Sequence, residues 1–358
     1  MPVLVKINFS TVMEDKEKKN VVSAGDNLTD YMETVIADLE KEGKFPAAHV
    51  YRSVLRSFTR FWNASAPMRD DPTSISNVFA PIRGVFTPER LKEYETWLME
   101  CECSPNTIST YMRTLQAVYN RRMPPGVAGY NPVLFKEVYT KVESRTKRAL
   151  TAEQMRQLET TDFNALSLPQ QRVLAYFLLM FMLRGMPFID LAHLRKQNLQ
   201  GRRIVYRRHK TGKLMMVDVP PDAFRLLQKY RNRAESEYLF PILNETSPGK
   251  ERYHLYQDTL RRFNRELARL MKKLLPGVSV SSYTARHTWA TLAYHSGTPL
   301  GLISQSLGHS SIRVTMSYLK PFDAEVIDKV NRQVIALVKG SKKKKVDSIN
   351  MLYGTLLR

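Results

Sequence analysis

The sequence predicts a mainly α-helical protein of two domains, an α-helical one followed by an α+β one with a small β-hairpin. Apolar residues recur at helical spacing on both sides of a proline- and glycine-rich break at residues 123–132. One later stretch, residues 203–219, is instead typical of two short strands joined by a turn. The length of 358 residues also exceeds the usual size of a single domain.

Residues 1–25 are expected to form an arm that begins with a short strand, Val3–Phe9. Residues 26–125 are expected to form one compact helical domain, because apolar side chains repeat at helical spacing and several helix starts carry a capping residue or a proline. The predicted helices run from a cap at Asn27 or Thr29 to Gly43, from Ala47 to Trp62, from Thr87 and Pro88 onward, and from Ser104 to about Arg122.

Residues 126–149 are predicted to be a linker, since they combine turn residues with a charged stretch that is short of large aliphatic side chains. The larger domain, residues 150–340, begins with a helix capped at Thr151 and continues with a strongly apolar helix, Val173–Leu183. The hairpin and further helices follow. Residues 341–358 are a tail that joins a lysine run to apolar residues.

The charge of the chain points to a polyanionic partner. Lys and Arg number 55 against 34 Asp and Glu, which leaves a net charge of +21. An anionic membrane surface or a ribosomal role is an alternative to DNA, but the basic residues are scattered over both halves and not gathered on one amphipathic helix. Double-stranded DNA is therefore the expected partner. The candidate contacts are Arg52, Arg56, Arg113, Arg121, Arg122, Arg207 and Arg208.

Other classes of protein find little support in the sequence. No stretch of about 18 apolar residues could cross a membrane, and the first residues lack the features of an export signal, so we expect a cytoplasmic protein with no membrane partner. Cys101 and Cys103 have neither a partner pair nor a histidine at metal spacing. No disulfide framework and no metal site are predicted.

Tyr318 is singled out by its spacing to other polar residues. It follows His309 by nine residues, and Arg286 precedes that histidine by twenty-three. The block ARHTWAT at residues 285–291, LGH at 307–309 and Tyr318 together resemble the carboxy-terminal motif of the tyrosine recombinase, or phage integrase, family. The resemblance covers residues 150–340 closely. The helical domain resembles the core-binding domain of the family in layout only.

The resemblance implies a set of catalytic residues that also suits phosphodiester chemistry. Tyr318 would be the nucleophile, Arg184 and Arg286 would stabilise the charged transition state, and His309 would bind the phosphate or assist proton movement. Lys210 on the hairpin would protonate the departing 5′ oxygen, with Lys213 as its rival. Neither ATP nor a metal would be required, because the 3′-phosphotyrosyl ester keeps the bond energy for rejoining.

Two positions depart from the family pattern. Tyr283 stands where the family usually has a histidine, and its high pKa makes it a poor base, so proton acceptance would fall to His309, His287 or water. His287 is otherwise expected to cap or buttress.

Pro187 stands at the usual place of the first arginine, three residues after Arg184. If the helix continued there, Arg184 would reach the phosphate from the same face. Otherwise Arg286 would be the one catalytic arginine of the site, aided by Arg207 or Arg208. Asp190 is expected to be a buried partner of such cations.

The resemblance implies a site-specific DNA recombinase that integrates, excises or inverts DNA as a tetramer on its substrate, and that can be monomeric when free. Two alternatives remain at this point: a strand-nicking enzyme such as a topoisomerase, and a non-catalytic DNA-binding regulator of the same fold. The tail, residues 341–358, is expected either to dock on a neighbouring subunit or to pack on its own domain.

Overall fold

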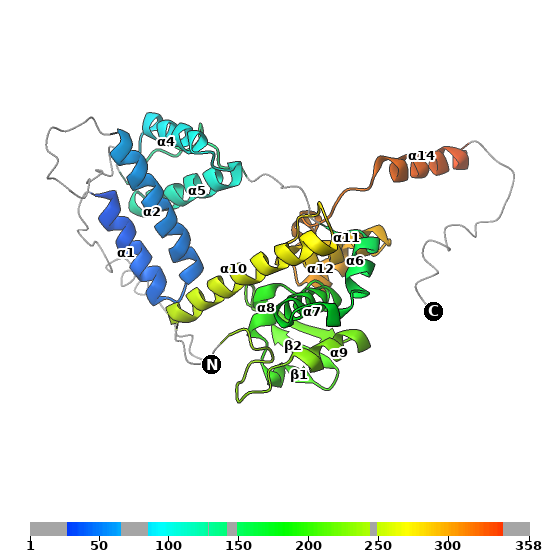
Figure 1. Ribbon diagram of the computed structural model, residues 1–358. Coiled ribbons are helices and arrows are strands. Elements are labelled where there is room, and N and C mark those ends of the chain that lie inside the picture. Colours follow the sequence, from blue (N-terminus) through cyan, green and yellow to red (C-terminus); the bar gives the residue numbers. More distant parts are fainter. Residues whose placement is uncertain (1–26, 66–84, 128, 142–148, 244–248, 339–358) are drawn as a thin grey trace, which may run out of the picture. The chain divides into compact units, whose positions relative to one another are not determined.

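The computed structural model describes residues 27–65, 85–127, 129–141, 149–243 and 249–338 (Figure 1). The chain divides into two compact units, residues 1–143 and 144–358. Both are helical, as the sequence predicted, and the second also holds a small antiparallel sheet. This sheet contains the predicted hairpin and one further strand, Leu199–Gln200. The predicted arm at residues 1–25 and the tail at 341–358 lie outside the described residues.

The first unit is built from helices whose starts are set by local sequence. Asn27, Thr87 and Ser104 each accept a hydrogen bond from a backbone N–H of the first turn that follows, and a proline comes directly after two of them. The helices are α1 (Leu28–Lys41), α2 (Phe45–Ser65), α4 (Pro88–Glu100) and α5 (Pro105–Arg122).

The core of the first unit extends past its last helix. Phe58 and Tyr94 lie at its centre with ring centroids 5.0 Å apart, and the Tyr94 hydroxyl donates to the Ser57 hydroxyl at 2.8 Å. Apolar side chains at residues 134–138 are buried in the same core, although the sequence predicted a linker there. The carboxylate of Glu95, which is 2% exposed, explains this, because it accepts from the backbone N–H of Tyr139 at 2.6 Å and holds the segment in place.

The second unit is arranged around one buried helix. The side chains from Val173 to Met180 are all buried, and helices α9, α10 and α11 pack against α7. A helix that is apolar on every face must be covered on every face, which explains its central place. The helices are α6 (Ala152–Glu159), α7 (Leu168–Met182), α8 (Phe188–His193), α9 (Pro221–Tyr230), α10 (Gly249–Leu274), α11 (Ser282–His295), α12 (Leu300–Leu307), α13 (Ile312–Met316) and α14 (Ala324–Val338).

The sheet covers part of this core with one of its faces. Its strands are β1 (Leu199–Gln200), β2 (Arg203–Arg207) and β3 (Leu214–Asp218), in the order β1-β2-β3. Ile204 pairs with Val217 and Tyr206 with Met215, and these four side chains are buried while their neighbours along the strands are more exposed. The β2–β3 connection, residues 208–213, is closed by the backbone N–H of Arg208, which donates to the Lys213 carbonyl at 2.9 Å.

Helix α14 differs from the other helices of this unit because every one of its residues is exposed. Its apolar side chains are Val326, Ile327, Val330, Val334, Ile335, Leu337 and Val338. No helix in the described part of the chain is both long enough and apolar enough to span a bilayer.

Candidate active site

Helix α11 places Arg286 in the interior of the second unit. Its guanidinium donates to the carbonyl of Gly185 at 2.8 Å, to the carbonyl of Leu307 at 2.6 Å and to Nε2 of His309 at 2.9 Å. The residue is 2% exposed. Gly185 has a φ of +64°, and a Cβ there would lie 3.0 Å from the Arg286 Cα. Glycine at this position therefore lets the chain pass close to α11.

Arg208 enters the same place from the end of strand β2. Its Nη1 donates to the carbonyls of Leu307 and Gly308 at 2.8 and 3.1 Å, and its Nε donates to Asp190 at 3.3 Å. Gly308 has a φ of +65°, and a Cβ there would lie 2.7 Å from the Arg208 Cδ and 2.8 Å from the Met215 Sδ. The glycine of the LGH motif is thus needed for both the local backbone and the position of this arginine.

The two guanidinium groups converge on one carbonyl oxygen, that of Leu307. Both arginines are buried, and burial together with the charge of Arg208 lowers the pKa of Arg286. The Nε of Arg286 is buried without a hydrogen-bond partner among the described residues. Asp190 forms an ion pair with Arg208 and confirms the prediction that it is a buried partner of cations. Two buried like charges and an unused donor are the features of an anion site.

His309 is held as a neutral ring with a defined tautomer. Because its Nε2 accepts from Arg286, its Nδ1 carries the hydrogen and donates to the Thr315 hydroxyl at 2.9 Å. Burial and the charges of Arg286 and Arg208 lower the pKa of His309 to about 3. The Nε2 of the ring is therefore unprotonated at neutral pH, and its lone pair is directed at the guanidinium of Arg286.

Tyr318 lies against these groups directly after α13. Its ring centroid is 5.4 Å from the Arg286 Cζ and 4.7 Å from the ring of His309. Its hydroxyl is 3.2 Å from the hydroxyl of Tyr283. Burial and the neighbouring Tyr318 raise the pKa of Tyr283 to about 12, which agrees with the expectation that it is a poor base. The structure thus brings together Tyr283, Arg286, His309 and Tyr318 from the predicted set.

Lys210 and Lys213 both lie exposed in the β2–β3 connection. The charges of both lysines lower the pKa of His309, and the effect of Lys210 is the larger of the two. Arg207 is exposed and donates to the Gly212 carbonyl at 3.1 Å within the same connection.

Arg184 takes a different direction from the rest of the predicted set. Helix α7 ends at Met182, and Arg184 itself adopts a left-handed backbone with a φ of +60°. The helix therefore does not continue to Pro187. Arg184 and Pro187 do not share a helix face, so the predicted route of Arg184 to the phosphate is absent. The Nη1 of Arg184 donates at 3.3 Å to the Met216 carbonyl of strand β3.

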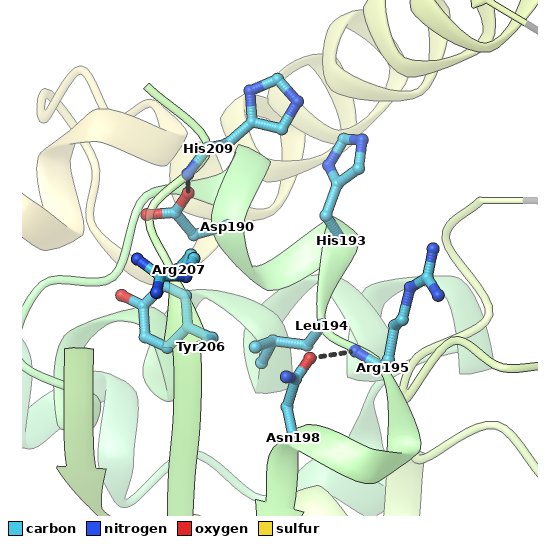
Figure 2. Close-up of a pocket in the computed structure, with 8 residues that line it drawn as sticks. All are labelled: Asp190, His193, Leu194, Arg195, Asn198, Tyr206, Arg207 and His209. Carbon is cyan, nitrogen blue, oxygen red and sulfur yellow. Dashed lines mark hydrogen bonds between the residues drawn. The ribbon is translucent and has the colours of Figure 1, made fainter. Parts of the chain in front are cut away.

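A cavity of about 280 Å³ lies behind the start of the hairpin connection (Figure 2). Asp190 forms part of its wall and accepts from the backbone N–H of His209 at 2.9 Å, so one carboxylate fixes both Arg208 and the residue before Lys210. The rings of His193 and His209 line the same cavity with centroids 4.6 Å apart. Residues that hold the hairpin in place therefore form the wall of this cavity. Within the described ranges, no three His, Cys, Asp or Glu side chains are placed to hold a metal ion.

The candidate DNA contacts of the first unit differ in their surroundings. Arg52 is paired with Glu40 at 2.5 Å, and Arg121 lies 3.5 Å from Asp38. Arg56 and Arg113 are exposed, and Arg122 is half-buried.

From the sequence alone, Arg208 was only a minor candidate, as one member of the basic run 207–210. A usable signal was the period of two along strand β2, because Arg208 has the same parity as the buried Ile204 and Tyr206. His287, which was expected to cap or buttress, does so, because its Nδ1 bonds to the Tyr318 carbonyl at 3.1 Å. The contact of Thr315 with His309 becomes visible only in three dimensions.

Comparison with known proteins gives a consistent family. Residues 148–325 match the Phage integrase family, and residues 27–138 match the Phage integrase SAM-like domain. A protein of Caldanaerobacter subterraneus subsp. tengcongensis described as "Tyrosine recombinase XerC-like" is 25% identical over 257 residues, which are 63% of this chain and 65% of that protein. The chain thus matches slightly less than two thirds of this relative's length.

Similar folds occur among solved structures. XerH site-specific recombinase bound to palindromic difH substrate has a TM-score of 0.57 at 17% identity, with 83% of each chain covered. The Tn1549 transposon integrase in complex with a circular intermediate DNA has a TM-score of 0.56 at 15% identity, with 86% of this chain and 99% of that chain covered. A lambda integrase dimer bound to a COC′ core site has a TM-score of 0.55 at 14% identity, with 82% and 95% covered.

The two matched regions follow one another along the chain and coincide with its two compact units. The protein belongs to the phage integrase family of tyrosine recombinases.

Proposed function

We propose that this protein is a site-specific recombinase that cleaves and rejoins double-stranded DNA through a 3′-phosphotyrosyl bond at Tyr318. The integration, excision or inversion of a DNA segment would be its role. One observation carries the proposal: the Tyr318 ring lies against Arg286 and His309, at a place where two buried guanidinium groups converge. A scissile phosphate bound between these groups would face the phenol oxygen.

The phosphate would be bound by Arg286 and Arg208, with Arg208 supplying the second guanidinium that Pro187 and the direction of Arg184 leave missing. Both groups stay protonated and can donate paired N–H groups to the non-bridging oxygens, which stabilises the charge of the pentacovalent transition state. The phosphate would also give the Nε of Arg286 the partner that it lacks.

The reaction requires two proton movements. The Tyr318 oxygen attacks phosphorus, and its proton passes to Nε2 of His309 once Arg286 turns to the phosphate. The negative charge of the bound phosphate would offset the cations that lower the pKa of His309, which would make the ring a stronger base. The bond between phosphorus and the 5′ oxygen breaks, and Lys210 gives that oxygen a proton. The 5′ hydroxyl of a second strand reverses these steps, so the energy of the ester is retained and no cofactor is consumed.

Tyr283 would act by hydrogen bonding. Its hydroxyl lies 3.2 Å from that of Tyr318 and keeps its proton at neutral pH, because its pKa is raised to about 12. It can therefore donate to the nucleophilic oxygen as negative charge develops there. This would replace the proton-sharing role that the family usually gives to a histidine at the same place.

Double-stranded DNA is the proposed substrate, in the cytoplasm. Among the similar structures, XerH is bound to its difH substrate and lambda integrase to a core site, the latter as a dimer. Exposed basic residues of the first unit, Arg56 and Arg113, are the proposed backbone contacts together with Arg121 and Arg122. Arg207 and Lys213 would add contacts from the hairpin.

Assembly of several copies on DNA, as a tetramer, is proposed from helix α14. Its apolar side chains are exposed, and in the described part of the chain nothing covers them. A second exposed apolar group, Leu302, Ile312 and Met316, lies on α12 and α13. Burial of α14 on the α12–α13 surface of a neighbouring copy would cover both. The tail at 341–358 would follow α14 onto that neighbour.

The proposal is tested by trapping the covalent bond. A DNA duplex with its specific site, nicked so that the cleaved fragment diffuses away, is incubated with the protein and with a Tyr318→Phe variant. A covalent adduct is expected for the wild type and not for the variant, while both bind the duplex equally. No adduct on a duplex that the protein binds specifically would contradict the proposal and favour a non-catalytic regulator.

A second assay separates recombination from nicking alone. Two labelled duplexes that carry the site are mixed with the protein, and joined products of mixed origin are expected. Adduct formation and relaxation of supercoiled DNA without such products would instead favour a topoisomerase-like enzyme.

A further inference from the structure

Three side chains on one stripe of helix α11 bind the backbone of the segment that carries Tyr318. His287 binds the Tyr318 carbonyl through Nδ1 at 3.1 Å, and His295 binds the Lys320 carbonyl through Nε2 at 3.1 Å. Between them, the Thr291 hydroxyl accepts from the Lys320 N–H at 3.2 Å. Residues four apart lie above one another on a helix, about 6 Å apart along its axis, so the three groups form one row.

The segment Tyr318–Phe322, here called the nucleophile strap, also packs along the same helix. Leu319 and the Tyr318 ring join a small apolar cluster around Ala290, and the ring of Phe322 stacks on His295 with centroids 4.6 Å apart. Hydrogen bonds and ring contacts therefore hold the strap against α11 over two turns of this helix.

The element before the strap gives Tyr318 much less support. Helix α13 has five residues, and Thr315 is the one that is buried, while Ile312 and Met316 are 48% and 59% exposed. So short a helix has little stability of its own. The position of the Tyr318 hydroxyl is therefore set largely by what holds the strap.

We propose that His287, Thr291 and His295 are positioning residues that align the nucleophile with the phosphate site, an inference that rests on the proposed function. The row belongs to the same helix as Arg286 and Tyr283. Helix α11 thereby sets the distance between the nucleophile Tyr318 and Arg286, the cation that would stabilise the transition state. Misplacement of a reacting atom by about 1 Å can lower a rate about 100-fold.

The test uses Thr291, which is 3% exposed, because two matched variants separate its hydroxyl from its shape. Thr291→Val keeps the volume and removes the acceptor of the Lys320 N–H, whereas Thr291→Ser keeps the acceptor. We expect the cleavage rate at saturating DNA to fall about 10- to 100-fold in Thr291→Val and to stay within about threefold of wild type in Thr291→Ser. DNA affinity is expected to be unchanged in both.

A modified substrate distinguishes placement of the nucleophile from protonation of the leaving group. When sulfur replaces the bridging 5′ oxygen, the leaving group no longer needs an acid, since a thiol has a pKa of about 8.5. This DNA is expected to restore cleavage in Lys210→Ala and not in Thr291→Val.

Amide hydrogen exchange gives a readout that does not depend on activity. The Lys320 N–H is expected to be protected in wild type and in Thr291→Ser, and to exchange faster in Thr291→Val. Equal cleavage by both variants, or equal loss in both, would overturn the proposal. A wild type without adduct contradicts the proposed function instead, while the exchange rates still report whether the row holds the strap.

Discussion

The two arginines at the centre of the candidate site reach it in different ways. Arg286 lies in a regular helix, one turn after Tyr283 and on the same helix as the residues that bind the strap. Arg208 lies at the end of a strand and is held by contacts from elsewhere in the chain, with Asp190 of α8 on one side and the carbonyls of Leu307 and Gly308 on the other. The guanidinium of each arginine is held by tertiary contacts, and for Arg286 these are the carbonyls of Gly185 and Leu307 and Nε2 of His309. The difference lies in the element that carries each arginine, which is a helix shared with Tyr283 for Arg286 and the end of a hairpin strand for Arg208.

This difference indicates how each half of the site can vary. A helix sets the spacing of its own side chains, so α11 fixes the spacing of Tyr283 and Arg286, although the guanidinium of Arg286 also depends on Gly185, Leu307 and His309. The half of the site that the hairpin carries, with Arg208, depends on the carboxylate of Asp190 and on the absence of a side chain at Gly308. If Arg208 binds the phosphate as proposed, a side chain of the hairpin replaces the arginine that the family usually has at the place of Pro187.

The largest expected effect distinguishes Arg208 from Arg184. Replacing Arg208 with alanine removes a donor to the transition state, so the rate of adduct formation is expected to fall about 100- to 1,000-fold. Arg184→Ala is the matched control, because Arg184 donates to the Met216 carbonyl on β3, and the rate of the variant is expected to stay within about fivefold of wild type. Reversed results would return the role to Arg184.

Gly308 offers the next largest effect, on stability. Gly308→Ala meets both an unfavourable φ and atoms of Arg208 and Met215, whereas Gly201→Ala has a similar φ of +61° and no atom within 4 Å of the new Cβ. The free energy of unfolding is expected to fall by about 1–2 kcal/mol in Gly201→Ala. A further loss of about 1–3 kcal/mol is expected in Gly308→Ala. Denaturant unfolding of both variants checks this, and equal losses would show that the arginine moves aside freely.

Asp190→Asn removes the charge that holds Arg208, in the hairpin half of the site, and does not alter a contact of Arg286. The pair with Arg208 is buried on both sides, with side chains 7% and 1% exposed, so loss of the charge is expected to lower the free energy of unfolding by about 3 kcal/mol. Adduct formation should fall with it, because the same carboxylate fixes His209 beside Lys210. A variant as stable and as active as wild type would show that this half is held without the ion pair.

The smallest effect concerns pH. The pKa of His309 is lowered from 6.5 to about 3, so between these values the unfolded chain binds a proton that the folded chain does not. The contribution of His309 to stability is therefore complete above about pH 6.5 and is lost as the pH falls toward 3. In His309→Gln, the decline of the unfolding free energy over this range should be shallower. An unchanged slope in denaturant titrations would assign the decline to other groups.

The α11 half could be predicted from the sequence because its residues lie in one contiguous block and its spacing is that of regular helices. Arg184 was harder, since the end of α7 at Met182 and the left-handed backbone that follows carry no strong local signal before Gly185. Arg208 was obscured by its basic neighbours, and its importance depends on burial, which composition does not report. The core position of residues 134–138 was missed because it depends on the distant Glu95.

The shared carbonyl of Leu307 has one further consequence. Its oxygen keeps the two guanidinium groups at the spacing of a single acceptor. If a phosphate binds between them as proposed, it would exchange with this peptide dipole and would not have to draw two dispersed side chains together. The entropy of ordering these arginines would then be lost when the chain folds and not again when it binds its substrate.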